Sequence, residues 1–594
     1  MSELETTPET VNTGSRMVFQ QECVFWLTAV LLLFIFLWSS ALDGHEAELA
    51  ESAREMMLTG SWFHTAVNWE IMHDLSIPAC WSIVPFAKLF GPSELASRLP
   101  SAIGALAVLG FLRLLGKQLF NNRTAFISCW MLLGSYGFLL WGRSAASDMG
   151  CMAALTGAVV WFFQREEKGG FLSDFVFFLF CFTAALFKDL MAALLPVLIV
   201  LPRVLMKEGQ RRFSWKTPLA FLPAALLFFL WLCLPGFMPP GQGQILTGNA
   251  GNLSAAARAW QYHILPALNL FTRNEHWYAY LCDLPRVLLP WTPLLLVGLA
   301  GFFKSWRSLP EKIRLTAAGT GIALIFLIIS GSDYWSYGMP LAPFIVLFGA
   351  AGLSDYGVER WNKWAFAAAF YICLACASFC FCSIIGYPLW KKIADYTPPA
   401  ALVLAPVITG GLCWAVLFMD HAPGSAMSRF IGLPHRTGAV FLTGTLLTGC
   451  AISVLLPVIR GEFRTEKRFF LELHRAVLKK FPESGSPVLI TFQRRLPPGY
   501  LFYNNLPLPV PRADDLDSPV FRTGETQKVV LFKDRPRIRE DFFSQCRRKN
   551  VTAVKHFMSE ELSRWSSQDS RNNRYTAYLI SLPNERTMKN EDRR

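Results

Sequence analysis

The feature that most constrains this chain is a series of long apolar runs that contain almost no charged residues. The first run extends from Cys23 to Leu42 and carries no charge. About 20 apolar residues are enough to cross the hydrocarbon core of a bilayer as a helix, and such a run is too long for the apolar part of a cleavable signal peptide. Because a backbone in lipid must satisfy its own hydrogen bonds, the runs predict helices. We therefore predict an α-helical polytopic membrane protein.

The apolar runs predict about 13 transmembrane helices by the length that a span requires. The predicted spans are 23–42, 98–115, 124–142, 148–164, 171–187, 190–206, 217–234, 286–303, 315–331, 338–357, 366–386, 400–419 and 437–458. The transmembrane domain is thus predicted to cover residues 23–458.

The basic residues divide unevenly between alternate short loops. One set of loops holds clusters such as Arg211, Arg212 and Lys216, whereas the opposite set holds isolated cations such as Arg143 and Lys188. Because Lys and Arg favour cytoplasmic loops, segment 1–22 is predicted to be cytoplasmic. The long loops 43–97 and 235–285 and the tail 459–594 then face the periplasm. This topology accounts for the net charge of +13 without a nucleic-acid partner.

The tail has the pattern of a small soluble α/β domain. Residues 467–481 predict an amphipathic helix, and further helices are predicted near 536–548 and 559–566. The predicted strands are 488–492, 528–532, 551–557 and 575–582, and this alternation favours an α/β fold.

The first long loop predicts two short helices. Leu49, Ala53 and Met56 lie on one face of the first, with the charged residues Glu51, Arg54 and Glu55 off that face. We expect this helix to lie in the plane of the membrane interface. A second helix is predicted over 78–90, ended by the Gly-Pro pair that follows it.

Ionisable residues gather at four places next to span ends, all on the predicted periplasmic face. They are Asp43, His45 and Glu46; His73 and Asp74; Arg143 and Asp148; and Lys188 with Asp189. Ionisable groups are costly near the hydrocarbon region, so they mark candidate sites. Helix capping and surface ion pairs remain the alternative interpretation for any single residue of this set.

Several motifs resemble those of the GT-C glycosyltransferases that use polyprenyl-phosphate sugars, a group that includes the bacterial aminoarabinose transferases and the protein O-mannosyltransferases. Glu94-Leu-Ala-Ser-Arg98-Leu-Pro-Ser101 carries most of the resemblance, and Glu51 to Trp62 looks like the first interfacial helix of the family. Gly142-Arg143, Asp148 and Lys188 fall where the family has a span exit, a second acid and a lysine. His276-Trp-Tyr, Pro290-Trp-Thr and Tyr337 resemble later segments.

The chain also departs from the family at positions that matter for chemistry. Without a gap, the acid of the family's Asp-Glu pair falls on His45, and Asp43 matches only with a slip of two residues. Leu75 and Asp333 stand where the family has lysines. The loss of one lysine that donates hydrogen bonds to the phosphate lowers the rate by about 10²–10³, by analogy with the loss of an oxyanion-hole donor.

The resemblance implies the transfer of a sugar from an undecaprenyl-phosphate-type carrier to a lipid A-like or other glycan acceptor at the outer face of the inner membrane. The implied acids are Glu46, Asp43 and Asp148, and the implied donor-phosphate ligands are Lys188 and Arg143. Possible substrate contacts are His45, Asp74, Arg98, His276 and Tyr337. No cofactor is required beyond the lipid-linked sugar donor, and no cluster of residues calls for a divalent metal.

Other functions remain open on the sequence alone. A protein O-glycosyltransferase would use the same donor with a Ser or Thr acceptor and would need a base. A non-catalytic membrane scaffold or lipid-binding protein of the same fold would explain the two absent lysines. A secondary transporter is disfavoured, because neither inverted repeats nor interrupted spans at the midplane are evident.

Overall fold

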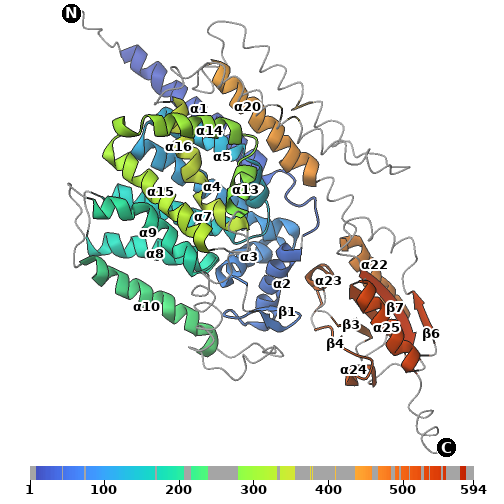
Figure 1. The fold of residues 1–594 in the computed structure, drawn as a ribbon. Coiled ribbons are helices and arrows are strands. Elements are labelled where there is room, and N and C mark those ends of the chain that lie inside the picture. Colours follow the sequence, from blue (N-terminus) through green and yellow to red (C-terminus); the bar gives the residue numbers. More distant parts are fainter. Residues whose placement is uncertain are drawn as a thin grey trace, which may run out of the picture.

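The computed structural model shows a helical bundle with a small α/β domain at one end (Figure 1). The structure describes residues 8–42, 44–72, 75–166, 170–206, 216–237, 279–330, 335–354, 435–457, 466–482, 488–493, 497–506, 509–522, 527–533, 535–549, 551, 553–556 and 575–582, with a few isolated positions between 375 and 409. Predicted spans 366–386 and 400–419 therefore lie almost entirely outside the described residues.

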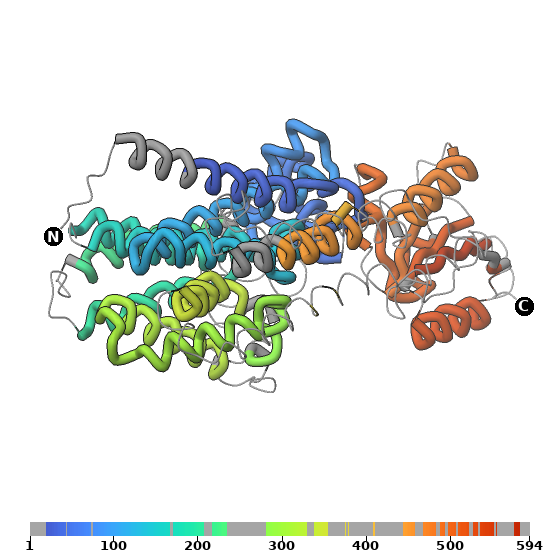
Figure 2. The backbone as a smooth tube through the Cα atoms, turned by 90° about the horizontal axis from the view of Figure 1, so that it is seen from above, coloured from blue at the N-terminus to red at the C-terminus, as the bar shows by residue number. Residues whose placement is uncertain are grey.

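The bundle is built from helices, and the longer ones run mostly side by side along its long axis (Figure 2). They are α1 (Pro8–Phe34), α4 (Glu94–Leu119), α5 (Asn122–Leu133), α6 (Tyr136–Gly142), α7 (Asp148–Gln164), α8 (Phe171–Phe187), α9 (Leu190–Leu205), α10 (Lys216–Phe237), α13 (Ala279–Val287), α14 (Thr292–Lys304), α15 (Glu311–Ser330), α16 (Ala342–Ser354) and α20 (His435–Cys450), with short 3₁₀ helices η5 (Trp306–Ser308) and η6 (Trp335–Leu341) and the π turn η8 (Ala451–Leu455).

Several of these helices have the length and composition of membrane spans. Three qualify alone, namely Glu94–Leu119, Thr217–Leu234 and Glu311–Ile329. Two bent pairs qualify together: α5 with α6, which meet at 68°, and α13 with α14, which meet at 111°. Each of the predicted spans 124–142 and 286–303 therefore contains a break, because Gly134 and Ser135 end α5 and Pro290 lies between α13 and α14. The total of 13 spans stays a prediction.

Glycine allows the closest approach within the bundle, between α14 and α16. A Cβ on Gly352 would lie 1.8 Å from the carbonyl oxygen of Gly298, and a Cβ on Gly298 would lie 2.2 Å from that of Gly349. Small residues let membrane helices approach until their backbones touch. Any side chain at Gly352 would force these two helices apart.

The first long loop forms two helices joined by a short hairpin. The helices are α2 (Gly44–Thr59) and α3 (Ile77–Phe90), and the hairpin pairs β1 (Thr65–Val67) with β2 (Glu70–Met72) in antiparallel register. The Ser76 hydroxyl accepts from Ala79 N and caps α3. The two helices agree with the prediction, whereas the hairpin was not predicted.

The C-terminal domain, residues 466–582, is a mixed five-stranded sheet between helices. The sheet order is β4-β3-β5-β7-β6, with β3 parallel to both β4 and β5 and with β7 antiparallel to β5 and β6. Its elements are α22 (Glu466–Lys480), β3 (Leu489–Phe492), α23 (Pro498–Asn504), β4 (Arg512–Ala513), α24 (Pro519–Arg522), β5 (Gln527–Lys533), α25 (Pro536–Arg548), β6 (Ala553–His556) and β7 (Tyr575–Ser581).

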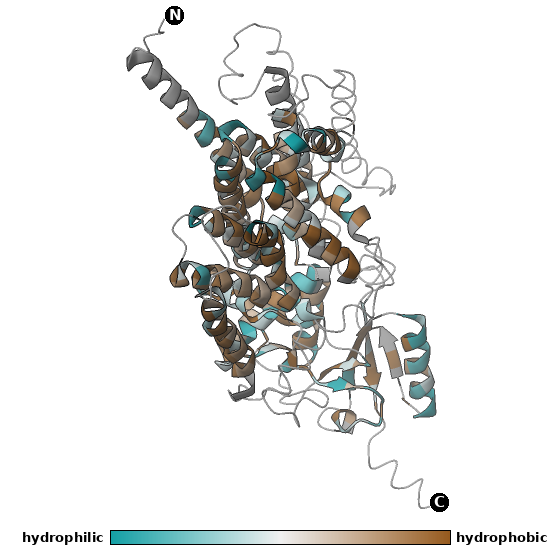
Figure 3. Cartoon of the chain, turned by 60° about the vertical axis from the view of Figure 1, so that its left-hand side comes forward, coloured by the Kyte–Doolittle hydropathy of each residue, from teal (hydrophilic) through white to brown (hydrophobic). Residues whose placement is uncertain are grey.

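Alternate residues of the strands cover opposite faces of this sheet. Leu489 and Val529 pack with α22, whereas Ile490 and Val530 pack with α25, as the two-residue period of a strand requires. The α/β fold expected for the tail is thus observed, although the predicted helix near 559–566 lies outside the described residues. Hydrophobic residues dominate the bundle, and hydrophilic ones gather on this domain (Figure 3).

The C-terminal domain is docked onto α2 and the hairpin. The Asn68 side chain donates to Val510 O (2.9 Å) and accepts from Val510 N (2.8 Å), and Tyr503 Oη accepts from Leu42 N (2.8 Å). Asn68 and Trp69 have φ values of 57° and 63°. A tryptophan in this left-handed region is strained, and such conformations persist where surrounding contacts hold them.

Candidate functional site

Among the ionisable residues predicted to share one face, those that the structure describes lie at the end of the bundle next to α2 and α3. The Ser101 hydroxyl on α4 donates to Ala146 O (3.1 Å), which fixes the loop between α6 and α7 against α4. The Ser76 hydroxyl donates to Leu186 O (3.0 Å), which places the start of α3 against the end of α8. Acidic and basic residues from five helices are thereby brought together.

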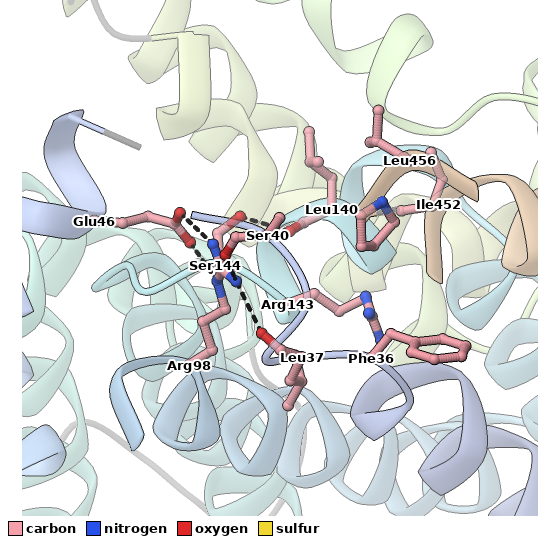
Figure 4. Close-up of a pocket in the computed structure, with 11 residues that line it drawn as sticks. Phe36, Leu37, Ser40, Glu46, Arg98, Leu140, Arg143, Ser144, Ile452 and Leu456 are labelled. Atoms are coloured by element: carbon pink, nitrogen blue, oxygen red, sulfur yellow. Dashed lines mark hydrogen bonds and ion pairs between the residues drawn. The ribbon is translucent and has the colours of Figure 1, made fainter. Parts of the chain in front are cut away.

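Arg98 and Glu46 form a buried clamp at this end (Figure 4). Arg98 Nε and Nη2 donate to the two carboxylate oxygens of Glu46 at 3.0 and 2.8 Å. The remaining N–H groups of Arg98 donate to the carbonyl oxygens of Leu37 (2.8 Å), Ser40 (2.9 Å) and Ala41 (3.1 Å). A guanidinium has five N–H donors, so this set engages all of them in contacts with the protein.

The carboxylate of Glu46 is also held by the loop between α6 and α7. Its Oε1 accepts from Ala145 N at 2.9 Å in addition to Arg98. Glu46 is buried, with 7% of the residue exposed. The pair therefore joins the exit of α1, the first turn of α2, the start of α4 and the loop that precedes Asp148.

Arg143 occupies a different environment from Arg98, although both border one cavity. Its Nη1 donates to Leu32 O (2.7 Å) and Leu33 O (3.1 Å), and its Nη2 donates to Ile35 O (2.5 Å) and Ser453 O (3.1 Å). The last carbonyls of a helix lack intrahelical partners, so Arg143 satisfies those at the end of α1. Its partners within the described residues are carbonyl oxygens.

A small cavity lies between the two arginines and the exit of α1 (Figure 4). Its volume is about 30 Å³, and it is lined by Phe36, Leu37, Ser40, Glu46, Arg98, Leu140, Arg143, Ser144, Ile452, Leu456 and Pro457. This volume is comparable to that of about one water molecule. The cavity is therefore too small to hold a sugar in this conformation.

Asp148 and Lys188 form a second buried ion pair. Lys188 ends α8, Asp148 begins α7, and Lys188 Nζ donates to Asp148 Oδ1. Their side chains are only 9% and 8% exposed. The negative charge of Asp148 in the first helical turn is also favoured by the helix dipole. Asp189 has a structural role here, because its Oδ1 accepts from Met191 N (3.0 Å) and caps α9.

The other predicted site residues are exposed or outside the described part. His45 is exposed at the start of α2, and its Nδ1 lies 3.4 Å from Glu48 Oε2. Asp43, His73, Asp74 and His276 lie outside the described residues, as does the side chain of Tyr337. Across the described ranges, no group of three or more His, Cys, Asp or Glu residues is placed to hold a metal ion.

Leu75 is buried where the family resemblance places a lysine. It packs in an apolar cluster with Ala79 and Ile83 of α3, and Phe187 contacts the same cluster. A lysine ammonium at this apolar position would need a charged partner. Leu75 is thus accommodated at this position by apolar packing.

A buried ionic cluster lies on α2. Glu51, Arg54 and Glu55, which the sequence places off the apolar face of this helix, are exposed by only 0%, 2% and 1%. The C-terminal domain contacts Arg54, and the hairpin contacts Glu55. Arg54 donates to Glu51 through Nε and Nη2 (2.8 and 2.7 Å) and to Asn505 Oδ1 (3.1 Å).

Burial raises the pKa of both carboxyl groups in this cluster. The pKa of Glu55 rises to about 8, first through desolvation and then through the negative charge of Glu51, and it is partly lowered by the Trp69 N–H that Glu55 accepts. Desolvation also raises the pKa of Glu51, against the opposing effect of Arg54. No local sequence pattern signals this cluster, because Arg54 binds Asn505, which lies 451 residues further along the chain.

Comparison with known proteins places this geometry in context. Residues 76–238 match the family described as dolichyl-phosphate-mannose-protein mannosyltransferase. This part includes α3 to α10 and therefore Arg98, Arg143, Asp148 and Lys188.

Two relatives are transferases of an amino sugar. The chain is 24% identical over 350 residues to undecaprenyl phosphate-alpha-4-amino-4-deoxy-L-arabinose arabinosyl transferase 2 of Proteus mirabilis (strain HI4320), covering 57% of this chain and 60% of that protein. It is 28% identical over 442 residues to the corresponding transferase of Shewanella sediminis (strain HAW-EB3), covering 66% of this chain and 75% of that protein.

The fold agrees with these sequence matches. The crystal structure of ArnT from Cupriavidus metallidurans bound to undecaprenyl phosphate superimposes with a TM-score of 0.65 at 15% identity, covering 94% of this chain and 97% of that one. This chain has a GT-C fold like that of the aminoarabinose transferases. The family resemblance predicted from the sequence is therefore confirmed, and the superposition extends it through the C-terminal domain.

Proposed function

We propose that this protein is a GT-C glycosyltransferase that moves a sugar from a polyprenyl-phosphate carrier to a lipid A-like or other glycan acceptor. The observation that carries the proposal is the buried Asp148–Lys188 pair, which lies at one end of a fold shared with ArnT. The named transferases of Proteus and Shewanella support an undecaprenyl-phosphate-linked donor. We further propose the outer face of the inner membrane as the place of transfer.

In the proposed reaction, the bond between the anomeric carbon and the carrier phosphate breaks, and a bond from that carbon to an acceptor oxygen forms. The carrier leaves as a polyprenyl phosphate with one more negative charge. Lys188 would stabilise that charge once its ammonium moves from Asp148 to the phosphate, since preorganised cations act where charge develops. Asp148 would then orient the acceptor or accept its proton.

The geometry supports a positioning role for Glu46 and Arg98. Both oxygens of Glu46 already accept hydrogen bonds from Arg98 or Ala145, so the carboxylate has little remaining capacity to act as a base. Arg98 would fix the segment that leads to Asp43, the other candidate acid. Arg143 would act on the donor phosphate through its charge, because no carboxylate of the described residues balances it.

The proposed topology places the N-terminus in the cytoplasm and the C-terminal domain in the periplasm. It rests on the distribution of Lys and Arg among short loops. In the structure, the C-terminal domain docks on α2 and the hairpin, so all of these segments lie on one side of the bundle.

The decisive experiment is sugar transfer by the purified protein with a panel of polyprenyl-phosphate sugars and lipid A as the acceptor. We expect Lys188→Ala to lower the rate by about 10²–10³, as for the loss of one oxyanion donor, and Asp148→Asn to lower it strongly as well. Glu166→Gln is a matched control, because Glu166 accepts from Arg203 (2.7 Å) at the far end of α7. Transfer that survives in both site variants would refute the proposed site.

A protein acceptor is the second candidate, because the matched family is described as a protein mannosyltransferase. Offering a Ser- or Thr-containing acceptor peptide beside lipid A, with the same donors, separates these two possibilities. No transfer from any donor to either acceptor would favour the non-catalytic alternative, for which the buried Leu75 is the structural support.

A further inference from the structure

An open groove lies between α1 and α4, at the end of the bundle opposite the candidate site. It has a volume of about 680 Å³ and is lined by Phe19, Glu22, Trp26, Ala107, Gly110, Phe111, Arg113, Leu114 and Lys117. Its walls are mostly apolar, and charged side chains stand at one end only. Sites that bind small molecules commonly measure about 300–1,000 Å³.

The position of the groove along α4 gives its depth in a bilayer. Arg98 and Lys117 are 19 residues apart (117 − 98) on a single helix, which corresponds to about 28 Å at 1.5 Å per residue. This length is close to the hydrocarbon core of a bilayer, about 30 Å thick. If Arg98 lies near one interface, Lys117 lies near the other, and the apolar walls between them face lipid chains.

The charged end of the groove carries an excess of positive charge. Arg113 is buried and donates through Nε and Nη2 to Glu22 Oε1 at 3.0 and 2.6 Å, so these two charges offset each other. Lys117 Nζ lies 3.8 Å from Glu22 Oε1, beyond hydrogen-bond distance, and its side chain is 46% exposed. Its ammonium therefore still has donors to offer at the rim.

We propose that this groove binds an anionic glycerophospholipid of the cytoplasmic leaflet. One acyl chain would lie along Trp26, Gly110 and Phe111, and the headgroup phosphate would pair with Lys117. Basic pockets between helices on the cytoplasmic side are suited to anionic headgroups. Gly110 leaves the floor open, since a Cβ there would meet only Trp26 Cη2, at 3.9 Å. This proposal requires a bilayer but does not depend on sugar transfer.

The test uses the full-length protein in nanodiscs with a photoreactive acyl chain on either phosphatidylglycerol or phosphatidylcholine. We expect phosphatidylglycerol to crosslink to peptides that contain residues 19–26 and 107–117, in preference to phosphatidylcholine. Lys117→Gln should lower that preference about fivefold, which is the change in binding constant expected for removing one cation near an anionic headgroup. Arg123→Gln, which changes an exposed cation at the same end, is the control and should leave it unchanged.

A second variant tests the apolar part of the groove. Gly110→Leu should reduce crosslinking of both lipids at these peptides by filling the floor. Equal labelling by the two lipids in the wild type, or an unchanged preference in Lys117→Gln, would overturn the proposal. The Lys117→Gln comparison remains decisive even if Gly110→Leu fails to fold.

Discussion

Replacing Arg98 with methionine should be among the most damaging single substitutions in this protein. The change removes five donated hydrogen bonds and leaves the Glu46 carboxylate buried without the guanidinium that offsets its charge. Removing one partner of a buried ion pair costs about 3–5 kcal/mol, because the other charge stays buried without compensation. Three carbonyl groups also lose a donor.

Glu46→Gln should be much milder than Arg98→Met. Arg98 would retain its three carbonyl partners, and the amide oxygen of glutamine could still accept one hydrogen bond from it. We expect a loss of about 1.5–3 kcal/mol, the range of a hydrogen bond to a charged group. The double variant should cost less than the sum of the two single variants, with a coupling energy of about 2 kcal/mol.

The measurement is the free energy of unfolding in mixed micelles with a denaturing detergent, for the wild type and the three variants. Sugar transfer measured on the same samples separates positioning from stability. Equal losses for the two single variants, or strictly additive losses in the double variant, would contradict the clamp derived from the structure. Glu166→Gln again serves as a control at the other end of the bundle.

Three further predictions concern other parts of the molecule. Because burial raises the pKa of Glu55 to about 8 from an ordinary value near 4.5, the contribution of Glu55 to stability should be fully present below pH 4.5 and should be lost as pH rises through 8. Glu55→Gln should therefore make the melting temperature less dependent on pH over that window. Asn68→Ala removes two hydrogen bonds to Val510 and should cost about 1–3 kcal/mol of docking, seen as faster proteolysis between the bundle and the C-terminal domain. Gly352→Ala should destabilise the bundle by at least about 1–3 kcal/mol through overpacking, whereas Gly321→Ala, which has open space, should be neutral or stabilising in a thermal melt.

The sequence predicted those parts of the fold that local pattern determines. Helix α8 begins and ends where predicted, since its mostly apolar run is bounded by Gly170 and Lys188. The hairpin β1–β2 was missed because each strand has three residues and its turn uses Asn68 and Trp69, with no glycine in the left-handed positions. Contacts with a distant domain make that turn possible.

The location of the candidate site stays a prediction, but the structure shows connections that the sequence could not. Ionisable residues at span ends mark one end of the bundle, and the structure joins two of them, Asp148 and Lys188, in an ion pair. The sequence could not show that Glu46 is held by Arg98, because 52 residues separate them and only the folded bundle brings them together. It also could not show that the C-terminal domain contacts Arg54, which a helical pattern alone places off the apolar face of α2.

The charge at the candidate site limits how a departing phosphate could be held there. Asp148 offsets the charge of Lys188 in the structure, so Lys188 attracts a phosphate most strongly once that ion pair loosens. The positive charge of Arg143 is not offset by a carboxylate in the described part of the chain, because its partners there are carbonyl oxygens. Leu75 adds no cation where the family has one. In our proposal Arg143 therefore attracts the arriving phosphate first. As negative charge builds up on the carrier phosphate, the Lys188 ammonium moves from Asp148 to that phosphate. Asp148 is then able to act on the acceptor.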